Sequence, residues 1–258
     1  MTTSLEPPDT VAEHARSRSV SWGLPFVERR KLGLSKILRD SDAAAALVFT
    51  RTGLAIGSHT TDTDVTLLRP HLSTAEIRLR SLRRGEGDPL VRAGEIAAGD
   101  TVLDCTYGLG RDAAVAAFAA GPNGRVTGLE SSKALAYMAA ENPVALEGAA
   151  DIDVRLANAC SWLEAAQSNS VDVVLIDPMF SAPTTSDATF ELLRNLADNT
   201  PLTPGWVDRA ARIARRWVVV KSSRHLDWFD DAGLEPVHSH GNARYFRRPA
   251  VEGEHLNS

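Results

Sequence analysis

Three acidic residues follow apolar segments of the sequence, each at the point where its segment ends. Asp104 comes after Thr-Val-Leu and before a glycine-rich turn, Glu130 ends the next apolar segment, and Asp177 follows the β-branched run 171–176. If each segment is a strand of one parallel sheet, the carboxyl ends share an edge, and the three carboxylates converge on one crevice there. Carboxylates in such a crevice accept hydrogen bonds from hydroxyl or amine groups and attract a cationic ligand.

The turn after the first strand has the composition of a loop that binds a ligand through its backbone. Gly108 and Gly110 lack a Cβ and tolerate positive φ, and the helix expected from Arg111 directs free N–H groups at a ligand. Glu130 lies twenty residues after Gly110, which suits a carboxylate that binds ribose hydroxyls. The same glycine spacing fits a dinucleotide fingerprint, so a nicotinamide-dependent oxidoreductase is an open alternative from this turn alone.

Asp104 distinguishes these two alternatives. It precedes the glycines, where a dinucleotide pyrophosphate would meet its negative charge and a cationic sulfonium cofactor would be attracted. Capping of the glycine turn is the structural alternative for this residue. The adjacent Cys105 is expected to be a small core residue rather than a nucleophile.

The tetrapeptide Asp177-Pro178-Met179-Phe180 resembles the Asp/Asn-Pro-Pro-aromatic motif of amino-directed nucleic-acid methyltransferases. A carboxylate and a carbonyl held rigid by proline can accept both hydrogens of an exocyclic amine, and an aromatic ring can stack on the base. Positioning of the nitrogen then provides most of the catalysis. We expect Asp177, Pro178 and Phe180 to be catalytic, and Met179 and Phe180 to contact the methyl acceptor. Core packing is the structural alternative for Phe180.

Five stretches together resemble the RsmJ-like family of S-adenosylmethionine-dependent methyltransferases. They are residues 102–112, 128–130, 157–161, 175–180 and 218–221. The resemblance covers roughly residues 88–248, and the part before it is similar to a less characterised branch of these enzymes. It implies a Rossmann-like class I methyltransferase fold and S-adenosyl-L-methionine as the cofactor.

The resemblance also implies which residues contact the cofactor. Carried onto this sequence, they are Arg111, Asp112, Glu130, Ser131, Cys160, Ser161 and Asp177. Asp104, Gly108 and Gly110 complete the cofactor site expected from the glycine turn. Glu130 would hold the ribose, and the segment around Cys160 and Ser161 would flank the adenine. Cys160 stands where the better-known members have serine.

The methyl acceptor is the least specified part of the prediction. The best-known members of the family methylate guanine N2 in small-subunit rRNA, so this base is the leading acceptor in an N-methyltransferase reaction. A small heteroaromatic metabolite is the alternative. A protein that keeps the fold and binds the cofactor without turnover is a further alternative, and the intact motif at Asp177 argues against it.

Three basic side chains are expected to contact the substrate. Lys221 follows the fifth strand and would meet a substrate phosphate or pair with Asp177, with a snorkelling surface lysine as the structural alternative. Arg78 and Arg80 lie in a short helix predicted by the capping-box sequence at residues 73–76. Phosphate contacts would make binding depend on salt, whereas a solvated helix face is the structural alternative for these arginines.

From Ile96 onward, strand and helix patterns alternate, which predicts an α/β fold with a mostly parallel sheet and helices on both faces. The seven expected strands are residues 101–105, 125–129, 152–156, 171–176, 217–220, 234–238 and 244–246. The last two form an antiparallel edge hairpin. Before this sheet, residues 46–50, 53–57 and 65–68 are expected to be short strands of a small N-terminal α+β segment.

The expected organisation has four parts. They are a flexible N-terminus (1–19), a small accessory subdomain (20–94), a methyltransferase domain (95–250) and a flexible tail (251–258). Residues 1–94 hold 14 basic and 11 acidic side chains, whereas the whole chain has a formal net charge of −5. A basic front is typical of a protein that meets a polyanion, but this small excess weakens the case for RNA.

Composition argues against several other classes of protein. Cys105 and Cys160 have no CxxC spacing and no nearby histidine pair, so neither a disulfide framework nor a metal site is expected. No apolar run approaches the length of a membrane span, and residues 1–19 lack the apolar core of a signal peptide. We therefore expect a cytoplasmic protein without membrane contact. The oligomeric state, monomer or homodimer, is left open.

Overall fold

The computed structural model describes residues 1–61, 64–178, 188–223, 225–237 and 244–251. The chain forms two compact units. Unit 1 consists of Met1–His71, Tyr137–Asn142 and Ala182–Ala197, and unit 2 of Leu72–Ala136, Pro143–Ser181 and Asp198–Ser258. All the site residues predicted from the sequence belong to unit 2.

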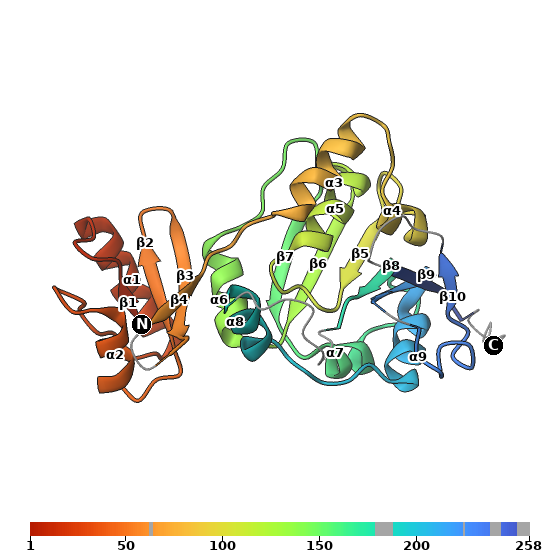
Figure 1. Cartoon of the computed structure of the whole chain (residues 1–258). Coiled ribbons are helices and arrows are strands. Elements are labelled where there is room, and N and C mark those ends of the chain that lie inside the picture. The colour runs from red at the N-terminus through yellow and green to blue at the C-terminus, as the bar shows by residue number, and fades with distance from the viewer. Residues whose placement is uncertain (62–63, 179–187, 224, 238–243, 252–258) are drawn as a thin grey trace. The chain divides into compact units, whose positions relative to one another are not determined.

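Unit 2 is built on a seven-stranded sheet (Figure 1). The strands are β5 (Thr101–Asp104), β6 (Arg125–Glu130), β7 (Asp151–Leu156), β8 (Val171–Ile176), β9 (Ala214–Ser222), β10 (Glu235–Val237) and β11 (Arg244–Pro249). Their order is β10-β11-β9-β8-β5-β6-β7, and each neighbouring pair is parallel except the two that involve β11. The predicted α/β fold, with a mostly parallel sheet and an antiparallel edge hairpin, is confirmed.

Helices cover both faces of this sheet, with α4 and α5 on one face and α7 and α9 on the other (Figure 1). The helices of the unit are α3 (Thr74–Arg83), α4 (Pro89–Gly94), α5 (Arg111–Ala120), α7 (Ala159–Ala165) and α9 (Pro204–Ile213), and α6 (Lys133–Glu141) begins in it. Val173 lies beside Gly94 of α4, whereas Val174 belongs to the core that includes α9. Because successive strand residues face opposite sides, a strand covered on both faces is apolar at nearly every position.

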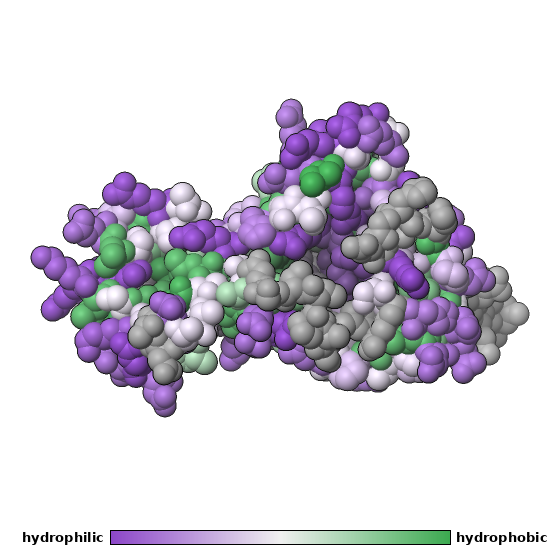
Figure 2. All heavy atoms as spheres, viewed as in Figure 1, coloured by the Kyte–Doolittle hydropathy of each residue, from purple (hydrophilic) through white to green (hydrophobic). Residues whose placement is uncertain are grey.

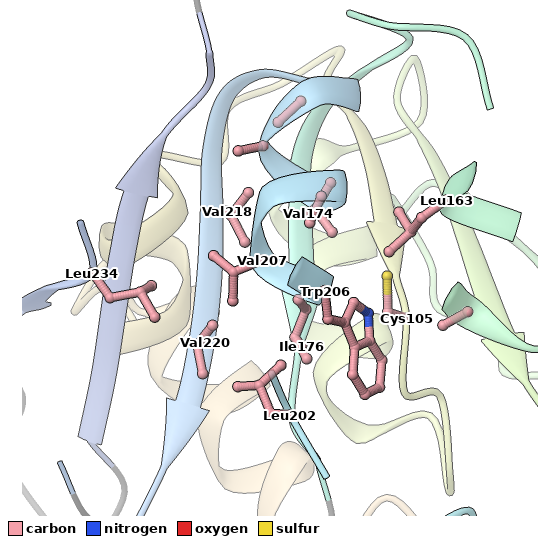
Figure 3. Close-up of a cluster of buried hydrophobic side chains, with 14 of the residues drawn as sticks. Cys105, Leu163, Val174, Ile176, Leu202, Trp206, Val207, Val218, Val220 and Leu234 are labelled. Carbon is pink, nitrogen blue, oxygen red and sulfur yellow. The ribbon is translucent and has the colours of Figure 1, made fainter. Parts of the chain in front are cut away.

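The core between the sheet and helices α7 and α9 fixes the ends of the strands that carry the predicted site. Figure 3 shows Cys105, Ile176, Val220 and Trp206 among its members. Ile176 directly precedes Asp177 and is 1% exposed, and Cys105 directly follows Asp104 and is 5% exposed. Cys105 is therefore a core residue, as expected, and burial raises the pKa of its thiol.

Unit 1 contains a four-stranded sheet of order β1-β2-β3-β4. Its elements are β1 (Thr2–Thr3), α1 (Asp9–Trp22), α2 (Leu34–Asp40), β2 (Ala45–Thr50), β3 (Gly53–His59), β4 (Val65–Leu68) and α8 (Ala188–Leu196). Strands β2 and β3 form an antiparallel hairpin in which Thr50 lies opposite Gly53. The three short strands expected in this region are thus present, with β1 as an additional edge.

The expectation of a flexible segment over residues 1–19 is wrong. β1 pairs in parallel with β2, and α1 extends from Asp9 to Trp22 and ends at Gly23 in the left-handed conformation. The helix buries only Ala15 and Ser19, so its sequence lacks the apolar stripe by which an amphipathic helix is recognised.

The capping box expected at residues 73–76 is also wrong, although the helix that it predicted is present. Ser73 precedes α3 with φ 46° and ψ −111°, and its side chain makes no capping hydrogen bond. An N-cap residue needs extended backbone to bring its oxygen over the first turn, and Ser73 does not adopt that conformation.

Candidate functional site

The carboxyl ends of three adjacent strands bring the predicted acidic residues to one edge of the sheet. Strands β8, β5 and β6 are neighbours, with Asp104 ending β5 and Glu130 ending β6. Asp104 pairs with Leu175 of β8, so Asp177 lies just beyond the end of that pairing. The convergence expected from the parallel arrangement is what the fold provides.

Tyr107 shapes the glycine turn, although no pattern in the sequence marks it. A Cβ on Gly110 would lie 2.5 Å from the Tyr107 hydroxyl, and one on Gly128 would lie 2.3 Å from Cδ2 of its ring. Gly110 adopts φ 72° as the N-cap of α5, and Gly108 adopts φ 54°. Gly110 is therefore needed both for its left-handed backbone and for the space that the tyrosine ring occupies, whereas Gly108 meets only the first need and Gly128 only the second.

Both oxygens of Glu130 are held by backbone amides. The N–H of Gly108 donates to Oε2 at 2.9 Å, and the N–H of Ser132 donates to Oε1 at 2.8 Å. The residue is 6% exposed, and burial raises its pKa, although these two amides act in the opposite direction. Each carboxylate oxygen accepts more than one hydrogen bond, so capacity remains for hydroxyl groups of a ligand.

Asp104 caps the turn that follows it. Its Oδ1 accepts a hydrogen bond from the Thr106 N–H at 2.9 Å, and the side chain is 3% exposed. Burial raises the pKa of Asp104 to about 7. The structural alternative raised for this residue is thus what the geometry supports, and the argument that its charge excludes a pyrophosphate is weakened because the carboxyl is only partly ionised at neutral pH.

Lys221 joins two carboxylates at the same edge. Its ammonium donates to Asp177 Oδ2 at 2.6 Å and to Asp112 Oδ2 at 2.8 Å. The backbone N–H of Asp177 donates to the Thr106 hydroxyl at 2.7 Å, which ties the end of β8 to the turn after β5. Of the two roles expected for Lys221, pairing with Asp177 is the one that this geometry shows.

Arg78 extends this cluster into α3. Its guanidinium pairs with both oxygens of Asp88 at 2.8 Å and also contacts Asp112. Asp88 is 2% exposed and caps α4 through the amides of the first turn. Because the Arg78 side chain is 20% exposed and already bound to two carboxylates, the structure does not support the phosphate contact expected for it.

The charges of the cluster shift the pKa values of its members in opposite directions. Burial raises the pKa of Asp177 and Asp112 adds to the rise, while Lys221 opposes it. Burial acts the same way on Asp112, but Lys221 and Arg78 outweigh it and lower its pKa. Burial alone would lower the pKa of Lys221, yet the two aspartates raise it above its ordinary value, so the lysine stays charged.

The segment predicted to flank an adenine forms the start of α7. Asn158 caps this helix by accepting from the Ser161 N–H at 3.1 Å, and Cys160 lies in its first turn, partly exposed. Asp198 was missed by the sequence reasoning. Its carboxylate accepts a hydrogen bond from the Ser131 side chain. Burial of Glu130 is the main cause of the raised pKa of Glu130, and the negative charge of Asp198 is a further one. No strand or motif precedes Asp198, so no pattern marks it.

One predicted residue, Arg80, lies apart from this cluster. Arg80 is on the exposed side of α3, 3.9 Å from Glu76 and with its side chain 64% exposed, which matches the solvated-face alternative. The surface over α3 is largely hydrophilic (Figure 2). Arg111 begins α5, where burial lowers the pKa of its guanidinium. Met179 and Phe180 lie outside the described residues.

Residues 29–245 match the model of a protein family described as "Putative SAM-dependent methyltransferase". The chain belongs to this family. It is therefore an enzyme that uses S-adenosyl-L-methionine to transfer a methyl group, which confirms the predicted enzyme class and cofactor. The oxidoreductase and the binding protein without turnover are set aside as alternatives.

Relatives of this methyltransferase include the uncharacterized protein YpiP of Bacillus subtilis. It is 28% identical over 249 residues, which cover 91% of this chain and 92% of YpiP. The ribosomal RNA small subunit methyltransferase J of Nitrosococcus oceani is 34% identical over 159 residues, covering 55% of this chain and 61% of that protein. The enzyme of the same description from Laribacter hongkongensis is 37% identical over 110 residues, 39% of this chain and 38% of its own. The recognition of an S-adenosylmethionine-dependent methyltransferase is confirmed, and the chain is similar over part of its length to two enzymes described as ribosomal RNA small subunit methyltransferase J.

The fold is shared with a solved methyltransferase structure. The SAM-dependent methyltransferase of Neisseria gonorrhoeae aligns with a TM-score of 0.61 at 19% identity and covers 98% of both chains. This supports the class I methyltransferase fold that the resemblance implies. Within the described residues, no helix has the length and apolar character needed to cross a bilayer.

Proposed function

We propose that this enzyme methylates an exocyclic or ring nitrogen of a nucleobase-like acceptor, with guanine N2 of small-subunit rRNA as the leading acceptor. The observation that carries the proposal is the fixed position of Asp177 beside the glycine turn, held through its backbone by Thr106 and through its carboxylate by Lys221. The similarity to two enzymes described as ribosomal RNA small subunit methyltransferase J supports the choice of acceptor.

The residues at the sheet edge fit S-adenosylmethionine by the chemistry of their groups. Glu130 has acceptor capacity left for ribose hydroxyls after binding two amides. A Cβ on Gly108 would meet only the Thr106 carbonyl, at 3.8 Å, so the backbone here is open to a ligand. Other residues proposed to hold the cofactor are Asp104, Gly110, Arg111, Asp112, Ser131, Cys160 and Ser161.

Bound cofactor supplies an electrophilic methyl group on a sulfonium centre, and the chain supplies the orientation of the acceptor. Asp177 and the Pro178 carbonyl accept the two hydrogens of the acceptor amine, with Phe180 stacking on its ring and Met179 beside it. On methylation the acceptor nitrogen would give up one proton, and the Asp177 carboxylate is the group proposed to accept it. Cys105 is buried in the core with a raised pKa, so transfer is direct rather than through this thiol.

A small heteroaromatic metabolite is the second candidate acceptor, and the charge of the molecule favours it. The formal net charge is −5. Two arginines of unit 1 are bound to carboxylates of the same unit, Arg16 to Glu28 at 2.6 Å and Arg18 to Glu141 at 2.6 Å. An RNA-binding surface usually keeps its arginines available for phosphates.

Transfer of a tritiated methyl group distinguishes the two acceptors. The enzyme is incubated with labelled S-adenosylmethionine and either small ribosomal subunits or a low-molecular-weight metabolite pool. We expect label in the rRNA, at the N2 position of a guanine after nuclease digestion. Label confined to small molecules would refute the rRNA assignment and leave the second candidate.

The role of Asp177 is tested by Asp177→Ala. Loss of the group that orients the acceptor should lower kcat by at least about a hundredfold while leaving cofactor binding largely intact. Asp172→Ala is the matched control, because Asp172 lies at the other end of the same strand and pairs with Arg215 at 3.1 Å. Near-normal turnover by Asp177→Ala would contradict the proposal.

A further inference from the structure

The arrangement around Lys221 connects elements that are far apart in the sequence. Lys221 lies on β9 next to Val220, which pairs with Ile176 of β8, so it stands beside Asp177, which directly follows that strand. Asp112, its other partner, is in the first turn of α5. One ammonium group therefore links the strand end that carries Asp177 to the helix that begins after the glycine turn.

Of the two ion pairs that Lys221 makes, the one with Asp112 is the more buried, whereas the Asp177 side chain is 40% exposed. The side chains of Asp112 and Lys221 are 11% and 27% exposed. Removing one member of a buried ion pair leaves the other uncompensated, which costs more than the pair contributes when complete. Arg78 supplies a second cation to Asp112, so the position of Asp112 does not depend on Lys221 alone.

The two oxygens of Asp177 are not equivalent. Lys221 binds Oδ2, and within the part of the chain that the structure describes no side chain or amide donates to Oδ1. The backbone amide of Asp177 is bound to Thr106, which holds the main chain of this residue in place. Together with the bond from Lys221 to Oδ2, this fixes both the start of the side chain and one of its oxygens. The orientation of Oδ1, the oxygen left for an amine donor, is then determined by Lys221.

We infer that Lys221 is a positioning residue for methyl transfer, bridging Asp112 and Asp177 so that Asp177 presents Oδ1 to the acceptor amine. This inference depends on the proposed role of Asp177. This role differs from contact with a substrate phosphate. If Lys221 bound a phosphate, its loss would chiefly weaken substrate binding and raise KM. A positioning role instead places the effect on turnover.

Several charged groups surround Lys221 and bear on any pH-dependent readout. Asp177, Asp112 and Tyr245 act on Lys221 directly, with Arg78 on the far side of Asp112 and Asp104 beside both aspartates. Removing the lysine charge takes away the principal group that lowers the pKa of Asp177. The Asp177 carboxyl should therefore titrate at higher pH in a Lys221→Met variant.

The test compares Lys221→Met and Lys221→Arg with wild type, using small ribosomal subunits as the acceptor probe or, if these are not methylated, the fraction of the metabolite pool that takes up label. We expect Lys221→Met to lower kcat about a hundredfold with KM for the acceptor within about threefold of wild type. Lys221→Arg keeps a cation and should recover much of the loss. Carbon-13 NMR of labelled aspartate, assigned with Asp177→Asn, should show the upward pKa shift of Asp177 without any acceptor present.

Arg216→Met is the matched control, because Arg216 lies at the other end of β9 and pairs with buried Asp100. It should reduce stability without changing kcat. A raised KM with unchanged kcat in Lys221→Met would overturn the inference, as would a loss that follows stability alone. If Lys221→Met fails to fold, Lys221→Gln, which also removes the charge, gives the same comparison. An active Asp177→Ala would refute the proposed function itself, whereas an inactive Asp177→Ala with normal kcat in Lys221→Met would refute only the positioning role.

Discussion

Replacing Asp104 with asparagine tests whether the buried carboxyl group of this residue retains its proton in the folded protein. Burial raises the pKa of Asp104 from 3.8 to about 7, with Asp112 and Asp177 adding to the rise and the Thr106 amide and Lys221 opposing it. The folded state therefore holds this proton more tightly than the unfolded chain. Since the folded state binds more protons between these two values, stability falls as pH rises from about 4 to about 7.

The magnitude follows from the size of the shift. A difference of about 3 pKa units corresponds to about 4 kcal/mol, at about 1.36 kcal/mol per unit, once the carboxyl is ionised in both states. Asparagine carries no charge and keeps an oxygen that can accept from the Thr106 N–H, although more weakly. We expect Asp104→Asn to be more stable than wild type by about 2–4 kcal/mol at pH 8. The difference should vanish or reverse near pH 4.

Urea unfolding of both proteins at several pH values between 4.5 and 8.5 measures this difference. Tryptophan fluorescence reports mainly on unit 2, because four of the five tryptophans lie in it. Asp100→Asn is the control, since Asp100 precedes β5 at its other end, is 7% exposed and pairs with Arg216, so its loss should destabilise the protein. If the difference in the free energy of unfolding between Asp104→Asn and wild type stays constant across this pH range, buried Asp104 does not retain a proton as inferred.

Two further substitutions test the cofactor contact and unit 1. Glu130→Gln should raise the Kd for S-adenosylhomocysteine about 10- to 100-fold in calorimetry, because hydrogen bonds to a charged acceptor contribute about 1.5–3 kcal/mol; an unchanged Kd would contradict the ribose-binding role. Asn142→Ala removes the bonds of this side chain to the Leu54 amide at 3.2 Å and carbonyl at 3.0 Å. It should destabilise unit 1 by about 1–3 kcal/mol. Faster hydrogen exchange of the Leu54 amide, with unit 2 unaffected, is the expected result, and unchanged exchange would show that these bonds contribute nothing.

The residues at the carboxyl edge of the sheet could be predicted, because the pattern of apolar residues alone shows where each strand ends. The β-branched run 171–176 coincides with β8, and the end of a parallel strand determines where Asp177 lies. The same rule located Asp104 and Glu130 without any knowledge of tertiary contacts. What a sequence provides here is the position of a side chain along its own strand and the edge to which that strand points.

Partners across the fold could not be predicted in this way. Lys221 reaches Asp177 because β9 and β8 pair in the register that sets Val220 beside Ile176, and nothing in either strand encodes that register. Arg78 meets Asp112 through the packing of α3 on α5, so its arginine-rich helix suggested a phosphate contact instead. Polar helices such as α1 escape recognition for a related reason, since few of their residues are buried.

Four carboxylates gathered at one sheet edge would repel one another unless each were compensated, and the fold compensates each differently. Asp104 retains its proton over much of the acidic range, Glu130 is held by two backbone amides, and Asp112 and Asp177 share the ammonium of Lys221. None of the four therefore presents an uncompensated charge to a ligand. The argument that net negative charge at this edge favours a sulfonium cofactor is therefore weaker than the sequence suggested. The same reasoning explains why Asp177 can lie close to Asp104 and Asp112 and still remain fixed, since the lysine that neutralises it also sets its orientation.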